Sequence, residues 1–122
     1  MELTKKGIEK RIEIKNDFVW YHSKNKNLDF SKIISIGEYA YLYGCSADLS
    51  SLKSIGNSAY LYGCSSDLSS LVSIGGSADL QGCSKELKKS LAKTLQKCDG
   101  IYVEFQDNPI TLDEFKEYAD KL

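Results

Sequence analysis

The sequence predicts an α/β fold: a short, right-handed solenoid with a parallel sheet, an N-terminal β-hairpin cap and a C-terminal helical cap. Nearly the same 19-residue unit occurs three times in succession, and a fixed period of about 20 residues is typical of stacked repeats. Each unit contains a short segment whose residues alternate with period two, as in a strand. Amphipathic helical patterns follow the third unit and would cover the open end of the stack.

The chain of 122 residues is long enough for one domain with a modest core. We divide this single domain into an N-terminal cap (1–28), three 19-residue repeats (29–85), a longer repeat that contains a helix (86–110) and a capping helix (111–122). The net charge of −1 gives no general attraction to nucleic acid or to an anionic membrane. Because we find neither a run long enough to span a membrane nor the apolar core of a signal peptide, we expect a cytoplasmic protein with free thiols.

The first 28 residues contain two strand-like segments separated by a turn signal. Ile12-Glu13-Ile14 alternates with period two, Asn16-Asp17 is typical of a turn, and Phe18-Val19-Trp20-Tyr21 is rich in strand-forming residues. We therefore expect a β-hairpin at the N-terminus.

The three repeats align as 29–47, 48–66 and 67–85. Four positions of the unit carry large apolar residues and two carry glycine: Phe30, Leu49 and Leu68; Ile33, Leu52 and Leu71; Ile36, Ile55 and Ile74; Leu42, Leu61 and Leu80; Gly37, Gly56 and Gly75; Gly44, Gly63 and Gly82. One unit cannot bury its apolar side alone, but stacked units can. The recurring glycines indicate either a turn with unusual φ and ψ angles or a close approach of two backbones.

The alternating segment also predicts which side chains face water. In Ala-Tyr-Leu-Tyr at 40–43 and again at 59–62, the two tyrosines point to the side opposite the alanine and leucine. The third repeat has Asp79 and Gln81 where the others have tyrosine. Two adjacent polar side chains would not be buried there without partners, so the tyrosine side is the exposed one.

This pattern resembles the leucine-rich repeat family, whose strand motif is L-x-x-L-x-L-x-x-N/C-x-L. Here it reads G-x-x-A-x-L-x-x-C at 37–45, with equivalents at 56–64 and 75–83, so that small residues replace the first two leucines. The resemblance covers about residues 29–110, and a different short β-solenoid is the main structural alternative. It implies that the strand face is a concave surface that grips protein partners, and that the cysteine position helps to tie the turn backbone together.

A fourth copy of the motif is expected further along the chain. Gly100-x-x-Val103-x-Phe105-x-x-Asn108 has the asparagine form of the motif, and its strand would expose Glu104 and Gln106.

The extra length before this copy predicts a helix that Ser84 can cap. Leu87, Leu91 and Leu95 would form its inner stripe, since they recur at helical spacing. Its outer side would carry five lysines: Lys85, Lys88, Lys89, Lys93 and Lys97.

The last segment reads as a capping helix. Thr111 and Glu114 have the spacing of a capping box. One apolar stripe follows: Leu112, Phe115, Ala119 and Leu122.

The cysteines at 19-residue spacing, Cys45, Cys64 and Cys83, raise the question of a metal. Coils in register stack at roughly 4.8 Å, so the outer two would lie about twice that distance apart, too far for one tetrahedral site. A disulfide between neighbours is geometrically conceivable, but parallel side chains and a reducing compartment argue against it. We predict a buried ladder of small apolar side chains and expect no metal and no cofactor.

Other chemistry has weak support. The single histidine, His22, lies beside a cap strand without a second histidine for a relay, so we interpret it as structural and expect no enzyme. The glycines do not form a phosphate-binding loop. The lysine-rich helix is a local basic patch, but acidic segments flank it and no arginine interleaves, so nucleic-acid contact through it is the less favoured alternative.

The tyrosine rows give the strongest functional signal. Tyrosine offers a large contact area with little rotamer entropy, although stacked tyrosines can also simply stabilise neighbouring strands. The exposed positions change in the third repeat while the inward positions do not, which favours binding. The predicted protein-binding residues are Tyr39, Tyr41, Tyr43, Tyr60, Tyr62, Asp79, Gln81, Glu104 and Gln106.

We therefore predict a non-catalytic protein-binding module, a monomer or a weak homo-oligomer, that contacts no membrane. Of the 16 basic residues only Arg11 is arginine, a bias that fits an AT-rich genome. A short chain of this kind is similar to phage accessory proteins that inhibit host defences, including CRISPR nucleases, which would place it in the host cytoplasm. The alternative is a structural subunit that self-assembles through exposed solenoid ends.

Overall fold

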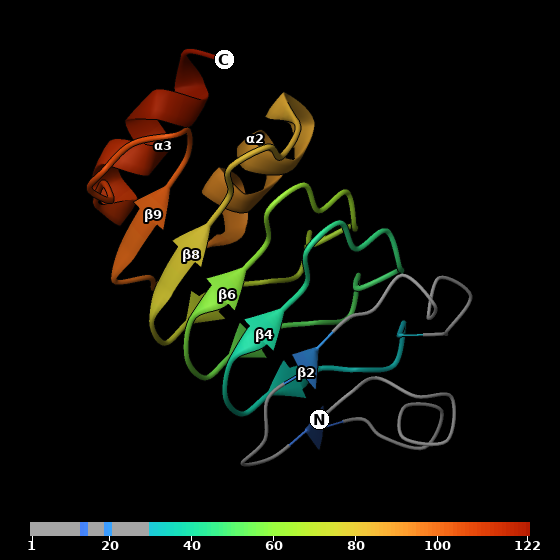
Figure 1. Ribbon diagram of the computed structural model, residues 1–122. Coiled ribbons are helices and arrows are strands. Elements are labelled where there is room, and N and C mark those ends of the chain that lie inside the picture. The colour runs from blue at the N-terminus through green and yellow to red at the C-terminus, as the bar shows by residue number, and fades with distance from the viewer. Residues whose placement is uncertain (1–12, 15–18, 21–29) are drawn as a thin grey trace.

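The computed structural model describes residues 13–14, 19–20 and 30–122 (Figure 1). The described residues form an α/β structure with two parallel sheets and two helices. The first sheet has the order β1 (Glu13–Ile14), β3 (Ser35–Ile36), β5 (Ser54–Ile55) and β7 (Ser73–Ile74). The second sheet has the order β2 (Val19–Trp20), β4 (Ala40–Tyr41), β6 (Ala59–Tyr60), β8 (Ser77–Asp79) and β9 (Gly100–Tyr102).

Each 19-residue repeat contributes one strand to each sheet, and equivalent residues pair with one another. Ile36 pairs with Ile55 in the first sheet, and Tyr41 pairs with Tyr60 in the second. The strands of the second sheet rise as a ladder from β2 to β9, with both helices at the C-terminal end (Figure 1). This arrangement agrees with the predicted α/β class and is compatible with a small solenoid-like fold.

The core lies between the two sheets and is built from the predicted repeat positions. All twelve aliphatic and phenylalanine residues of the four aligned sets are buried, with exposed fractions of 2% or less. The three ladder cysteines are buried beside them. The strands are short, but the second sheet's backbone ladder runs on past them, since the Leu42 amide donates to the Tyr60 carbonyl at 2.9 Å. Stacking of like residues therefore buries a continuous core, as repeat stacking requires.

The two glycine series serve different purposes, and both predicted purposes occur. Gly63, which precedes Cys64, has a φ of +65°, a conformation that glycine adopts readily. Gly56 lies against the preceding coil, where a Cβ atom would meet the Gly37 carbonyl oxygen at 2.1 Å. One series therefore turns the chain and the other sets how closely successive coils approach.

The prediction of an N-terminal hairpin is wrong. Strands form at both expected places, but β1 pairs in parallel with β3, and β2 pairs in parallel with β4. The two strands thus belong to different sheets and add one more rung to each. Parallel pairing to the next coil extends both ladders, so β1 and β2 follow the geometry of the repeats.

The register predicted for the fourth copy is wrong by two residues. In the structure Ser77 pairs with Gly100, Ala78 with Ile101 and Asp79 with Tyr102. A slip of two residues keeps every side chain on the same face, so alternation alone could not detect it.

The observed register changes which residues after β9 are buried and which are exposed. Ile101 and Val103 are buried, whereas Phe105, expected to point inward, is 78% exposed. Asn108 is displaced by the same amount and does not align with the ladder cysteines. The second sheet ends here because the amide of Ile101 donates to the carbonyl of Ile110 at 2.8 Å and the reverse bond is 2.9 Å.

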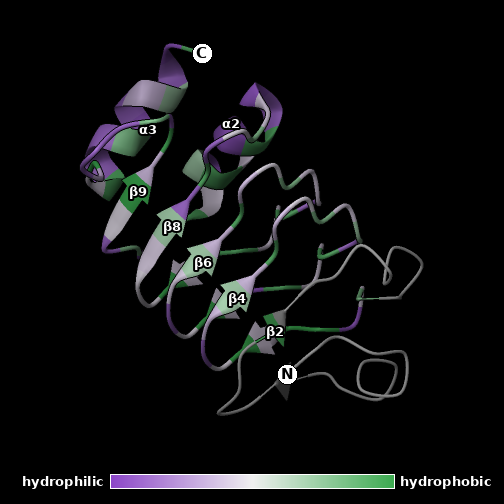
Figure 2. Cartoon of the chain, viewed as in Figure 1, coloured by the Kyte–Doolittle hydropathy of each residue, from purple (hydrophilic) through white to green (hydrophobic). Residues whose placement is uncertain are grey.

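Both predicted helices form with the expected caps. The Ser84 hydroxyl accepts from the Leu87 amide at the start of α2 (Lys85–Thr94). The Thr111–Glu114 capping box begins α3 (Leu112–Asp120), with both reciprocal hydrogen bonds present. Figure 2 shows hydrophilic and hydrophobic segments on each helix, in agreement with amphipathic helices that cover one end of the core.

Candidate functional site: the tyrosine face

The predicted tyrosine cluster forms on the outward side of the second sheet. The rings of Tyr41 and Tyr60 are stacked, with centroids 5.0 Å apart and planes 3° from parallel. Tyr39 and Tyr43 also lie against Tyr60, at 6.4 and 6.2 Å between centroids. Tyr43 and Tyr62 keep 48% and 44% of their surface exposed. We call the outward residues Tyr39, Tyr41, Tyr43, Tyr60, Tyr62, Asp79, Gln81 and Tyr102 the tyrosine face.

The corrected register brings one residue into this face that sequence reasoning missed. Tyr102 pairs with Asp79 and therefore continues the row that begins with Tyr41 and Tyr60. Aligning the copies on the inward Ala78 and Ile101, and not on glycine, would have found it.

Glu104 and Gln106 lie in the turn after β9 and make internal contacts. The Glu104 amide donates to the Gln106 side-chain oxygen at 2.7 Å. The Glu104 carboxylate accepts from the Tyr118 hydroxyl at 3.0 Å. Glu104 thus connects the sheet edge to α3, and Gln106 contacts Glu104 within the turn. The predicted tyrosines, Asp79 and Gln81 instead lie on β4, β6 and β8 or within two residues of them.

A hollow interrupts the row of tyrosine rings. It has a volume of about 280 Å³ and lies between Tyr60 and Tyr102, where the third repeat has Asp79. Its remaining lining comes from Ser58, Ala59, Ser77 and Ala78. We call this hollow the Asp79 slot. It exists because a short side chain occupies a row position that is tyrosine in the repeats before it.

Asp79 is held in a defined orientation. Its Oδ1 accepts from the backbone amide of Gln81 at 3.0 Å. Within the described part of the chain it forms no ion pair. Burial raises the pKa of Tyr43, and the nearby Asp79 carboxylate adds to this shift. The negative potential of the Asp79 carboxylate therefore reaches Tyr43.

Exposed Phe105 extends the aromatic surface toward α3. Its ring meets the edge of Tyr62 at 6.3 Å between centroids, with an interplanar angle of 61°. A shallow hollow of about 520 Å³ continues from there to Glu114, Glu117 and Tyr118. The sequence motif missed this contact because it assigned Phe105 to the core.

The ladder cysteines are internal, as predicted. Cys45 and Cys64 are 0% and 1% exposed, and the Ser66 hydroxyl donates to the Cys45 sulfur at 3.3 Å. Hydrogen bonds from the Cys64 thiol and from Ser66 lower the pKa of Cys45 to about 7, against the effect of burial. Donation to Cys45 and burial together raise the pKa of Cys64. Both sulfurs are therefore part of the interior and are not accessible to a substrate.

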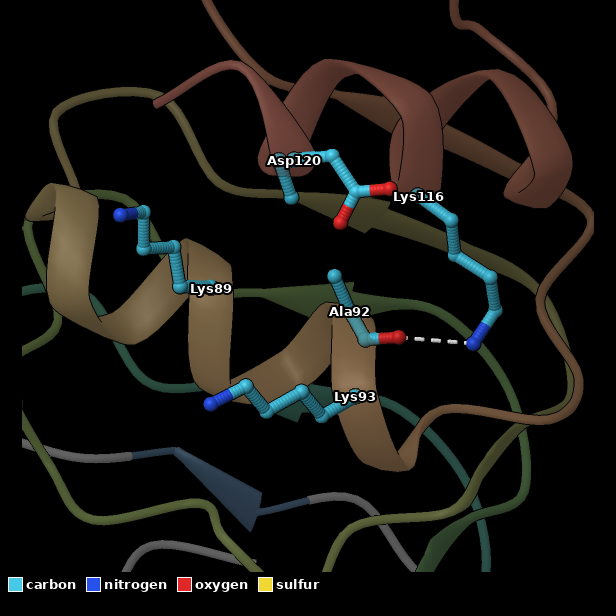
Figure 3. A pocket seen from close by; sticks show the side chains of 6 residues that line it. Lys89, Ala92, Lys93, Lys116 and Asp120 are labelled. Atoms are coloured by element: carbon cyan, nitrogen blue, oxygen red, sulfur yellow. Dashed lines mark hydrogen bonds between the residues drawn. The ribbon is translucent and has the colours of Figure 1, made fainter.

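The lysine-rich helix presents a mixed surface. A hollow of about 440 Å³ between α2 and α3 is lined by Lys89, Lys93, Lys116 and Asp120 (Figure 3). Lys116 donates to the Ala92 carbonyl at 2.7 Å, as the dashed line in Figure 3 marks. A carboxylate beside three amines, one of them already bonded to the backbone, offers a weaker attraction to phosphate than the lysines alone would suggest.

Lys88 does not lie on the outer side of α2, where it was predicted. It is 9% exposed, and its amine contacts the Tyr118 hydroxyl at 3.4 Å and lies 5.7 Å from the ring centroid of Tyr118. The other four predicted lysines are exposed or half-buried. Lys88 therefore belongs to the contact between α2 and α3, which helical periodicity alone did not reveal.

Among the residues that the structure describes, no cluster of three or more His, Cys, Asp or Glu could hold a metal ion. His22 lies outside those residues. Neither described helix is long and apolar enough to cross a membrane.

Comparisons with protein-family models, with curated proteins and with solved structures found no match.

Proposed function

We propose that this chain is a non-catalytic protein-binding module, a short leucine-rich-repeat-like solenoid that uses its tyrosine face. One observation carries the proposal: along β4, β6, β8 and β9 the inward residues stay aliphatic while the outward residues change from tyrosine to aspartate and back. Folding alone requires the first pattern and gives no reason for the second.

The exposure of the tyrosines supports binding over a purely structural role. Stacking against Tyr60 accounts for part of the surface of Tyr41 and Tyr43. Nearly half of Tyr43 and Tyr62 remains in water, where large aromatic side chains are typical of interaction surfaces. Tyrosine is also among the residues that dominate binding energy at protein interfaces.

Self-assembly through the solenoid ends is the competing proposal. The C-terminal edge argues against it, since β9 already pairs with Ile110 and α3 lies beyond it. A covered edge offers no free backbone groups to a further strand. Light scattering over a concentration series separates the two, because end-to-end assembly requires mass to rise with concentration.

The test uses the two most exposed tyrosines of the face. We expect Tyr43→Ser with Tyr62→Ser to abolish affinity capture of the partner from a lysate, read by mass spectrometry. The matched control replaces Lys93 and Lys97, two exposed lysines, with serine and should capture the same partner. Circular dichroism confirms folding of both variants. Unchanged capture by the tyrosine variant would refute the proposal, and loss in the lysine variant alone would favour the basic helix.

A narrower form of the proposal takes the partner to be a host defence protein that a phage-encoded inhibitor occupies. The near absence of arginine supports such a source. Neighbouring genes test it directly: a phage neighbourhood is expected, and a housekeeping operon would count against it.

A further inference from the structure

The Asp79 slot has the features of a receptor for one cationic group. It is lined by the aromatic residues Tyr60 and Tyr102, by the Asp79 carboxylate and by two serines. This combination arises where one residue breaks the row of tyrosines, while the strands on both sides keep an aromatic residue.

The spacing of the two rings suits a bound cation. Tyr60 and Tyr102 lie on β6 and β9, with β8 between them. Two strand spacings of roughly 4.8 Å place them about 10 Å apart. A cation midway would lie about 5 Å from each ring, within the ~6 Å over which cation–π attraction acts.

The charges point to the same ligand. Asp79 carries a carboxylate that no lysine in the described residues pairs with. A nucleic-acid base could also stack between two rings, but its phosphates would meet this negative charge. A positively charged protein side chain meets no such repulsion.

The shape favours arginine over lysine. Tyr41 and Tyr60 stack with nearly parallel planes, so a flat group entering the slot continues the stack. The arginine guanidinium is flat, so it can stack on an aromatic face and can form two parallel hydrogen bonds with a carboxylate. The lysine ammonium is a compact point charge and has neither of these two abilities.

From this geometry we propose that the Asp79 slot receives an arginine side chain of the protein partner, held between Tyr60 and Tyr102 and paired with Asp79. This inference rests on the proposed function and deepens it, since it names the chemistry that the partner must present. It also gives the change from tyrosine to aspartate in the third repeat a purpose.

The test titrates the ¹⁵N-labelled full chain with the peptide acetyl-Gly-Arg-Gly-amide and follows the amide signals of Tyr60, Asp79 and Tyr102. Matched peptides carry citrulline, which has the shape without the charge, or lysine, which has the charge without the flat fork. We expect saturable shifts at the slot with arginine, weaker binding with lysine and no binding with citrulline. Equal shifts with citrulline, or shifts outside β6, β8 and β9, would overturn the proposal.

Two variants of the slot make the test specific. Asp79→Asn keeps the shape and should weaken the arginine peptide about ten-fold, ~1.4 kcal/mol. Asp79→Tyr fills the slot with the residue that the first two repeats carry, so folding should persist while slot binding is lost. Asp99→Asn, at an exposed carboxylate outside the face, is the control and should bind normally. Peptide binding that survives Asp79→Tyr would overturn the proposal.

The failure of this inference is distinguishable from the failure of the proposed function. The peptide titration measures binding at the slot alone, whereas affinity capture measures partner binding by the whole tyrosine face. If Asp79→Tyr captures the partner as well as the unchanged chain does, the slot is not used although the face still binds. If the Tyr43 and Tyr62 variant also captures it normally, the proposed function itself is wrong.

Discussion

The two sheets are made from the same repeats, yet their outward residues follow opposite rules. The first residue of β3, β5 and β7 is serine in every repeat. The outward residue of β4 and β6 is tyrosine, that of β8 is Asp79 and that of β9 is Tyr102. Since both sheets share the same coil spacing, the constancy of one and the variation of the other reflect different demands on the two surfaces.

The first sheet is constrained by close backbone contact. Gly56 and Gly75 follow β5 and β7 directly, and a Cβ atom on either would lie 2.1 Å from a carbonyl oxygen of the coil before. The residue directly after β4, β6 and β8 is a buried leucine instead: Leu42, Leu61 and Leu80. The first surface therefore sets how closely successive coils approach, and the second tolerates different outward residues.

The largest expected effect comes from breaking the constrained surface. Gly56→Ala should lower the free energy of unfolding by about 3 kcal/mol or more, because the new methyl group meets backbone that cannot move aside. Gly63→Ala is the matched control: its backbone has positive φ but no atom within 4 Å of the new Cβ, so about 1 kcal/mol is expected. Urea denaturation measures both. Equal decreases in the free energy of unfolding would show that the close contact between coils at Gly56 does not constrain the first sheet.

A smaller effect on stability is expected on the free surface. Tyr60→Ser removes ring contacts with Tyr39, Tyr41 and Tyr43, which should lower the free energy of unfolding by about 1 kcal/mol. The amount of captured partner should fall sharply, although the variant stays folded. A loss above that of Gly56→Ala would instead assign the tyrosines a mainly structural role.

The smallest effect is expected at the outward serine of the first sheet. Ser54→Thr should change stability by no more than about 0.5 kcal/mol, as surface substitutions usually do, and should leave partner capture intact. Urea denaturation and partner capture are measured in parallel for Ser54→Thr and Tyr60→Ser. A loss of capture would mean that the first sheet also contacts the partner and would remove the distinction between the surfaces.

Sequence reasoning predicted the interior well because the interior repeats. Each aliphatic set recurs at 19-residue spacing, and burial of like on like left no alternative for Leu42, Leu61 and Leu80. The helix caps were equally predictable, because Ser84 and the Thr111–Glu114 pair act on their own first turns.

Pairing between distant segments was harder to predict. The two N-terminal strands were found, but a local turn signal suggested a hairpin where the chain pairs with the next coil. The two-residue shift in the register of β9 was not predicted, because such a shift leaves every side chain on the same face of the strand. The Asp79 slot depends on that register, so it could be recognised only once Tyr102 was placed opposite Asp79.

The close contact between successive glycines has an evolutionary consequence. Because coils meet through backbone alone at Gly37, Gly56 and Gly75, a coil can be duplicated or deleted without redesigning its neighbours. Each duplication would move the Asp79 slot by one strand spacing, roughly 4.8 Å, along the row of tyrosines. Recombination between near-identical gene segments could thus change the number of coils while the interior residues stay the same.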